Sequence, residues 1–255
     1  MISALSTAAL ATEIKKTTRS TLVRSATALI IVGIAGLAAT MSLAMINGNQ
    51  QVAAKLGPLG AEHGWNQLTG ILAMIAAPAE LLGFGVVLSW VVGREFADGT
   101  ISGLFGLPVS RARIASAKLV VFSAWGASTA LGLTVAGTLL GLALGYGIPD
   151  TGQVAGLLRL LTVGLLTVFL ALPAGLAATM GRGLLPGIAL TIAMIALGQV
   201  FVIAGTGAWF PIAAPALWAI ASSQVRVAQV ALVPVTGIAF GLLTTRRWSL
   251  LQLDR

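Results

Sequence analysis

The sequence contains no cysteine, a single histidine and few charged residues. Without cysteine it can form no disulfide bond, thiolate metal site or thiol nucleophile, and one histidine argues against a histidine-based metal site. Charged residues make up 9% of the chain, whereas they make up about a quarter of a typical soluble domain. This shortage of charge excludes a soluble globular protein.

Apolar segments dominate instead, with 57% hydrophobic residues and a mean hydropathy of +0.98. Six of them reach the length of about 20 residues that a helix needs to cross about 30 Å of hydrocarbon. We therefore predict an all-α membrane protein with one transmembrane domain over residues 1–255, in which residues 1–25 form an N-terminal interfacial segment. The predicted spans are residues 26–46, 68–92, 119–148, 160–180, 184–208 and 227–245.

The basic residues are distributed unevenly between the two sides of these spans. If the N-terminus is cytoplasmic, 12 of the 15 lysine and arginine residues fall on the cytoplasmic side, and only Lys55, Arg159 and Arg226 fall on the other. The positive-inside rule then predicts that both termini are inside. Because alanine and glycine are abundant, as in high-GC bacterial genomes, we expect a multi-pass protein of a bacterial cytoplasmic membrane. The net charge of +8 is explained by this sidedness, so we expect lipid and no nucleic acid as a partner.

Three segments have a predicted structural role. Residues 1–25 carry apolar residues near one helical face ahead of a basic cluster, which predicts a helix along the cytoplasmic membrane surface, with a disordered tail as the alternative. The segment Trp209 to Ser223 contains two prolines and is flanked by tryptophans, so we predict an external re-entrant or interfacial hairpin. Gly137, Gly141 and Gly145 form a small-residue stripe that predicts close helix packing.

The most informative segment is the charged loop between the second and third spans, residues 93–118. Ile101, Leu104, Phe105 and Pro108 follow at i, i+3, i+4 and i+7, which predicts a short helix with one apolar edge. Ser110 is placed to cap the helix of the third span. The loop is a predicted docking surface for a partner; the alternative is a loop that only maintains topology.

This loop resembles the E-x-x-x-G-T…L-P-x-S-R…K pattern of ABC-2 type transporter permeases, particularly short six-span permeases similar to drug and bacteriocin self-resistance exporters. The matching residues are Glu95, Gly99, Thr100, Leu107, Pro108, Ser110, Arg111 and Lys118. The resemblance implies that residues 95–107 form a coupling helix in a groove of a separate ATP-binding subunit. The coupling residues expected from it are Glu95, Phe96, Asp98, Gly99, Thr100, Ile101, Leu104, Phe105, Pro108, Ser110 and Arg111.

The resemblance also implies two copies of the ATP-binding subunit and a second permease copy, a homodimer being expected. ATP and magnesium would bind that subunit, and no cofactor or metal is expected in this chain. The sequence agrees, because it has no G-x-x-x-x-G-K-[ST] phosphate-binding loop. Ser102 and His63 fall on opposite sides of the predicted topology, so a Ser–His catalytic pair is not expected, and neither is an enzyme.

Glu80 lies in the middle of the second span, two residues after Pro78. A charged carboxylate at that depth costs about 2.5 kcal/mol or more, so Glu80 must face protein, water or a partner, or be protonated. Two interpretations stay open. Glu80 lines the substrate path, or it makes an interhelical hydrogen bond at the proline kink.

Together these features predict the permease subunit of an ATP-driven exporter that works by alternating access. Its mostly apolar walls predict an apolar or amphiphilic substrate such as a drug, a peptide antibiotic or a lipid. The resemblance to self-resistance exporters implies a role in antibiotic resistance. The alternative is a substrate-binding membrane subunit of an importer, which would need a polar pocket on the external side.

Overall fold

The computed structural model describes residues 2–220 and 225–252, and this part of the chain is helical without any strand. Six helices in it are long and apolar enough to cross a membrane, as the sequence predicts. They are Thr21–Ile46, α5 (Gly64–Ala97), α7 (Arg111–Ala143), α8 (Thr151–Met180), α9 (Leu184–Ile203) and α11 (Val227–Ser249). The first of them is continuous through α2 (Thr21–Ala28), a π-helical turn (Leu29–Gly33) and α3 (Ile34–Ile46).

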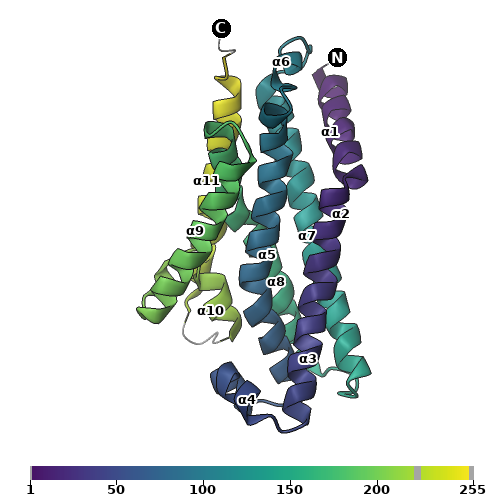
Figure 1. Ribbon diagram of the computed structural model, residues 1–255, viewed down its shortest axis with the longest axis vertical. Coiled ribbons are helices and arrows are strands. Elements are labelled where there is room, and N and C mark those ends of the chain that lie inside the picture. Colours follow the sequence, from purple (N-terminus) through teal and green to yellow (C-terminus); the bar gives the residue numbers. More distant parts are fainter. Residues whose placement is uncertain (1, 221–224, 253–255) are drawn as a thin grey trace.

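The long helices run roughly along the long axis of an elongated bundle, with α5 near its centre (Figure 1). The short helices lie at its two ends. At one end lie α1 (Ile2–Arg19) and α6 (Ile101–Leu104), beside the end of α11; at the other lie α4 (Gln50–Leu56) and α10 (Ala214–Ile220). We call these the α6 end and the α4 end.

Local sequence signals explain several helix boundaries. α8 begins with a capping box. Asp150 Oδ1 accepts a hydrogen bond from the backbone N–H of Gln153 at 2.8 Å, and Gln153 Oε1 accepts one from the backbone N–H of Asp150 at 3.0 Å. α7 begins after Ser110, as predicted, but the Ser110 hydroxyl makes no capping hydrogen bond. α7 ends at Ala143 rather than continuing to Ile148, because Gly145 and Gly147 turn the chain with positive φ.

Glycine allows the closest helix contacts, as the stripe in the third span predicts. A Cβ at Gly141 would overlap the ring of Trp65, and one at Gly137 would lie 2.7 Å from Leu72. The Trp65 indole also donates to the carbonyl of Gly147 at 3.2 Å. Gly145 lies beyond the end of α7, so it serves the turn and not the packing.

The predicted interfacial helix does form, but it does not lie across the end of the bundle. α1 runs roughly parallel to the long axis in Figure 1 and packs against α7. An ion pair holds it there, because Glu13 of α1 is buried and contacts Lys118 of α7. A position of α1 along the membrane surface stays a prediction.

The predicted external hairpin is described only in part, since Ala221 to Gln224 lie outside the described residues. The rest forms a 3₁₀ turn (Gly207–Trp209) and α10, which packs against α5 and α8. A re-entrant course remains a prediction.

We expect Gly141→Leu to lower the free energy of unfolding by about 1–3 kcal/mol, because the new side chain must displace the Trp65 ring. Thermal melting of the detergent-solubilised chain measures the effect. Ala124→Leu is the matched control, since Ala124 is an exposed small residue of the same helix. Equal melting temperatures for the two variants would contradict the packing role of Gly141.

Candidate functional site

Four charged side chains from three helices meet at the α6 end of the bundle. The Lys118 ammonium of α7 lies 2.8 Å from Glu95 Oε1 of α5 and 3.0 Å from Glu13 Oε2 of α1. Lys16 of α1 also reaches Glu95 Oε1, at 3.1 Å, and Glu13 Oε1, at 3.5 Å. We call Glu13, Lys16, Glu95 and Lys118 the ion cluster.

Burial makes the ion cluster structurally important. The Lys118 side chain is 1% exposed and the Glu95 side chain 3%, while Lys16 is the solvent-facing member at 33%. Two carboxylates and two ammonium groups balance each other. A buried charge is tolerated only with such partners, and removing one partner is strongly destabilising.

The ion cluster also fixes the start of the loop. The Thr100 hydroxyl donates to Glu95 Oε2 at 2.6 Å, so one carboxylate accepts bonds from Thr100, Lys118 and Lys16. Gly99 between them has φ +68°, a conformation that glycine adopts without strain. The residues of the E-x-x-x-G-T…K pattern thus converge on one buried carboxylate.

A second set of contacts holds the far side of the loop. The Arg111 guanidinium lies 4.4 Å from the centroid of the Phe105 ring and donates to the carbonyls of Leu251, at 2.6 Å, and Ser249, at 3.2 Å. Arg111 therefore joins the loop to the end of α11. Phe96 adds to this junction by packing edge-on against Trp248, with ring centroids 5.9 Å apart.

The structure divides the predicted coupling residues into two groups. One group makes contacts within the chain: Glu95, Phe96, Thr100, Ile101, Leu104, Phe105 and Arg111. Asp98, Gly99, Pro108 and Ser110 are exposed at the tip of the loop. Docking by either group remains untested.

Two expectations about the loop need correction. Glu95 is 2% exposed and offers no docking surface, because α5 continues to Ala97 and directs the carboxylate inward. The helix predicted over residues 95–107 is only α6, four residues long. Its apolar edge faces the protein, since Ile101 and Leu104 pack against the core and Phe105 against Arg111.

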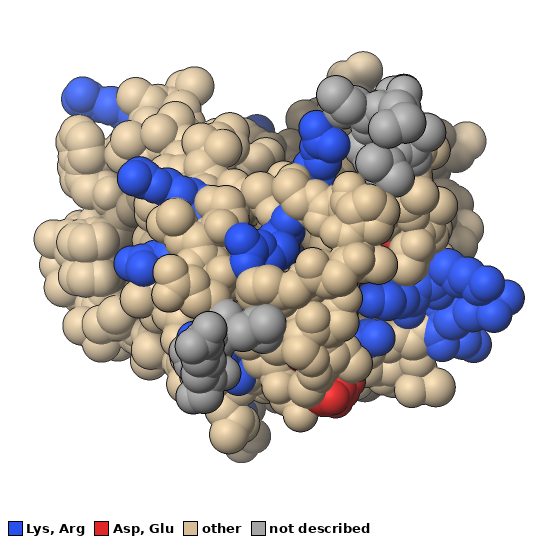
Figure 2. Space-filling model, turned by 90° about the horizontal axis from the view of Figure 1, so that it is seen from above, with Lys and Arg blue, Asp and Glu red and all other residues tan. Residues whose placement is uncertain are grey.

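An apolar hollow of about 270 Å³ separates the loop from α1. Leu104, Leu107 and Pro108 line it on the loop side, and Ala8 and Thr12 on the α1 side. Leu107 is 50% exposed. The view onto the α6 end shows lysine and arginine spread over this face and little acidic surface (Figure 2).

Glu80 lies inside the bundle, far along α5 from the ion cluster. It is 1% exposed, and Gly164 of α8 leaves room for it, because a Cβ at Gly164 would lie 3.1 Å from Glu80 Oε2. Among the described residues Glu80 Oε2 has no hydrogen-bond partner. Oε2 therefore makes no interhelical hydrogen bond within the described residues, and both interpretations of Glu80, the substrate path and the hydrogen bond at the proline, stay predictions.

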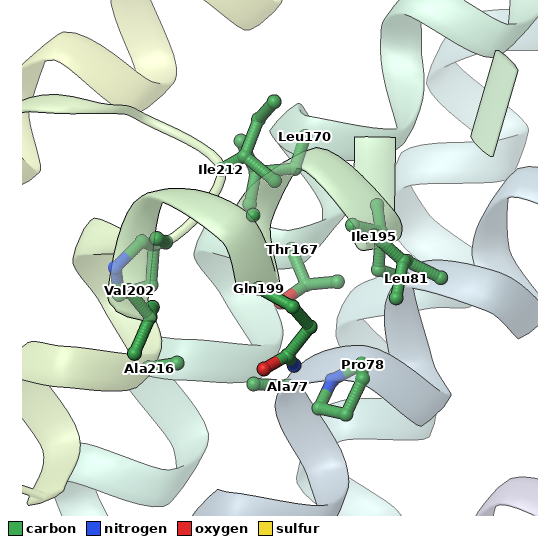
Figure 3. Close-up of a pocket in the computed structure, with 13 residues that line it drawn as sticks. Ala77, Pro78, Leu81, Thr167, Leu170, Ile195, Gln199, Val202, Ile212 and Ala216 are labelled. Atoms are coloured by element: carbon green, nitrogen blue, oxygen red, sulfur yellow. The ribbon is translucent and has the colours of Figure 1, made fainter. Parts of the chain in front are cut away.

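A small hollow of about 60 Å³ lies beside the proline of α5 (Figure 3). Ala77 and Pro78 of α5, Thr167 of α8 and Gln199 of α9 line it, and the Gln199 amide points toward Ala77 and Pro78. The remaining lining is apolar, and Glu80 is not part of it.

A comparison with known protein families identifies the family of this chain. A sequence model of the ABC-2 family transporter proteins matches residues 9–198, from α1 to α9. The chain belongs to the ABC-2 transporter family. The match includes the ion cluster and the loop, and it confirms the resemblance found in the sequence. No curated protein matches the chain.

Membership makes this ABC-2 chain a multi-pass membrane transport subunit and implies a partner subunit that binds ATP. Sequence reasoning identified Glu95 and Lys118 but missed Glu13 and Lys16 as their partners. A signal was present, because Glu13 is the only acidic residue before Glu62. An isolated carboxylate beside a lysine cluster indicates a specific partner.

We expect Lys118→Met to lower the free energy of unfolding by about 3–5 kcal/mol, because it leaves Glu13 and Glu95 short of their shared buried cation. Thermal melting in detergent measures this loss. Adding Glu13→Gln should recover part of it by removing one of the stranded charges. Lys15→Met is the control, since Lys15 is exposed; a similar loss in that variant would exclude a special role for the ion cluster.

Proposed function

We propose that this ABC-2 chain is the permease subunit of an ATP-driven exporter in a bacterial cytoplasmic membrane. It works as a homodimer with two ATP-binding subunits, which hold ATP and magnesium, and both of its termini are cytoplasmic. The chain itself catalyses no reaction. It moves an apolar or amphiphilic substrate, such as a drug, a peptide antibiotic or a lipid, by alternating access.

The observation that carries this proposal is the attachment of the loop to several long helices at once. The ion cluster connects the start of the loop to α5, α7 and α1, and Arg111 connects its end to α11. A force applied to the loop by a closing ATP-binding subunit would therefore act on all four helices. A loop that only maintained topology would need no such buried connection.

The contacts of α5 support transmission to the rest of the bundle. α5 packs along α8 and α9 and also contacts α7 and α3. Leu88 of α5 lies against Gly175 of α8, and Ser89 against Gly187 of α9. These close contacts would carry a tilt of α5 to the neighbouring helices, since packed interfaces shift as rigid bodies.

The docking surface that fits this proposal is the outer side of the loop and the neighbouring hollow. Asp98, Leu107 and Pro108 are exposed there, and Leu107 reaches into the hollow beside α1. A partner side chain entering this hollow would touch both α1 and the loop. Glu95 and Lys118 act indirectly, as positioning residues.

The substrate class rests on the composition of the helix surfaces. Large apolar side chains are exposed along α9 and α11, among them Ile192, Leu197, Val235 and Ile238. Surfaces of this kind suit lipid or an apolar substrate.

We expect Leu107→Asp to abolish co-purification of ATPase activity with the tagged chain from native membranes, because a carboxylate would enter an apolar contact. Vanadate-sensitive ATP hydrolysis in the eluate is the measurement. Leu250→Asp is the control, since Leu250 is 63% exposed at the same end and outside the hollow. Equal activity in both variants, or none with the unaltered chain, would contradict the docking site.

The orientation has its own test, which exploits the absence of cysteine. We expect Lys55→Cys to react with a membrane-impermeant maleimide in intact cells, and Ser102→Cys only after permeabilisation. Both positions are exposed, at the α4 end and the α6 end respectively. The opposite labelling pattern would place the termini outside.

A further inference from the structure

A polar hollow of about 360 Å³ opens at the α4 end of the bundle, the end opposite the ion cluster. Its walls come from the start of α5, from α8 and from the end of α10. Ligand pockets in proteins span about 300–1,000 Å³, so this hollow has room for a small ligand or a headgroup. The proposed docking surface for the ATP-binding subunit does not include this hollow.

Glycine and alanine create the space. Gly152 and Gly156 of α8 and Gly70 and Ala73 of α5 line the hollow beside Thr69. A Cβ at Gly156 would lie 2.9 Å from Thr69 Oγ1, so the two helices are in close contact at this level. The hollow is therefore bounded by firmly packed helices.

Arg159 is the unusual residue of its lining. It is exposed and lies eight residues after Thr151, the first residue of α8, which places it about 12 Å along this helix at a rise of 1.5 Å per residue and one residue before the predicted span. Among the described residues the Arg159 guanidinium has neither an ion pair nor a hydrogen bond. An unpaired cation in the wall of a hollow is available to a ligand group of opposite charge.

The opposite charge is present in the same hollow but does not neutralise Arg159. Glu62, just before α5, lines the hollow together with Asn66, and its carboxylate forms no ion pair with Arg159 within 4.0 Å. Within the part of the chain that the structure describes, the hollow thus presents an exposed cation, an exposed carboxylate and an exposed amide that have no side-chain partner. Glu62 would repel a purely anionic ligand, and Arg159 a purely cationic one.

We propose that this hollow binds a zwitterionic group, with an ammonium against Glu62 and a phosphate or carboxylate against Arg159. Asn66 offers both a donor and an acceptor between them. Such a group can come from the headgroup of phosphatidylethanolamine or from a free solute such as phosphoethanolamine. The inference is independent of the proposed function, since it requires neither ATP coupling nor a transport direction.

The competing explanation is that Arg159 contacts lipid headgroups by itself, without Glu62. It makes a different prediction. In that case Arg159 would hold any anionic headgroup and Glu62 would have no influence. A zwitterion site requires both charges. The decisive quantity is therefore the preference for phosphatidylethanolamine over phosphatidylglycerol.

The test is native mass spectrometry of the full chain in detergent, titrated with each of the two lipids. We expect the unaltered chain to bind phosphatidylethanolamine about tenfold more tightly than phosphatidylglycerol, the effect of one charge-assisted hydrogen bond. Glu62→Gln should remove this preference. Arg159→Gln should lower the affinity for both lipids by about tenfold, and Arg159→Lys should retain the preference. Melting temperatures confirm that each variant is folded.

Lys55→Gln is the matched control, because Lys55 is an exposed cation at the α4 end that does not line the hollow. The proposal is overturned if Glu62→Gln leaves the lipid preference unchanged, or if Lys55→Gln acts like Arg159→Gln. Calorimetry with phosphoethanolamine separates the two sources. Binding of phosphoethanolamine without binding of the lipid would support a free solute as the ligand, and binding of neither would reject the site.

Discussion

The ammonium group of Lys118 sits between the carboxylates of Glu13 and Glu95, in a place that water barely reaches. Each of these three residues belongs to a different helix, so their electrostatic attraction is also the connection among α1, α5 and α7. Coulomb attraction is strong where water is excluded, and the cost of an unpaired charge there is high. The arrangement of the α6 end depends on this balance.

The loop between α5 and α7 owes its shape to the same residues. Glu95 holds Thr100 at one side of the loop, and Arg111 holds Phe105 and the end of α11 at the other. A short connection is usually mobile because it lacks buried contacts. This one is fixed at both sides, which is the property that a mechanical link between two subunits requires.

α5 extends from the α4 end of the bundle to the α6 end. It begins beside the hollow of Glu62 and Arg159, passes Pro78 and Glu80 in the interior, and ends in the ion cluster. Its residues Gln67, Thr69, Glu80, Ser89 and Glu95 are buried, as expected when lipid surrounds the bundle. In the proposed exporter a movement at the loop would reach the α4 end through this helix.

Much of the fold could be predicted from the sequence, because a span is recognised by its length and hydropathy, and these predicted the six helices. The family was indicated by the resemblance of the loop motif and not by hydropathy. The ends of the helices were less accurate. α7 begins after Ser110, as predicted, but it ends at Ala143, where glycines turn the chain, and not at Ile148. Hydropathy does not detect such ends, since a charged helical turn can lie outside the hydrocarbon.

The candidate site was only half predictable. The motif identified Glu95, Thr100 and Lys118, but their role as a buried cluster with Glu13 and Lys16 depends on residues 79 and 105 positions apart in the chain. The sequence by itself determined which segments cross the membrane, since that is a property of each segment alone. Only the tertiary structure decided which charges are buried together, because pairing depends on how separate helices pack.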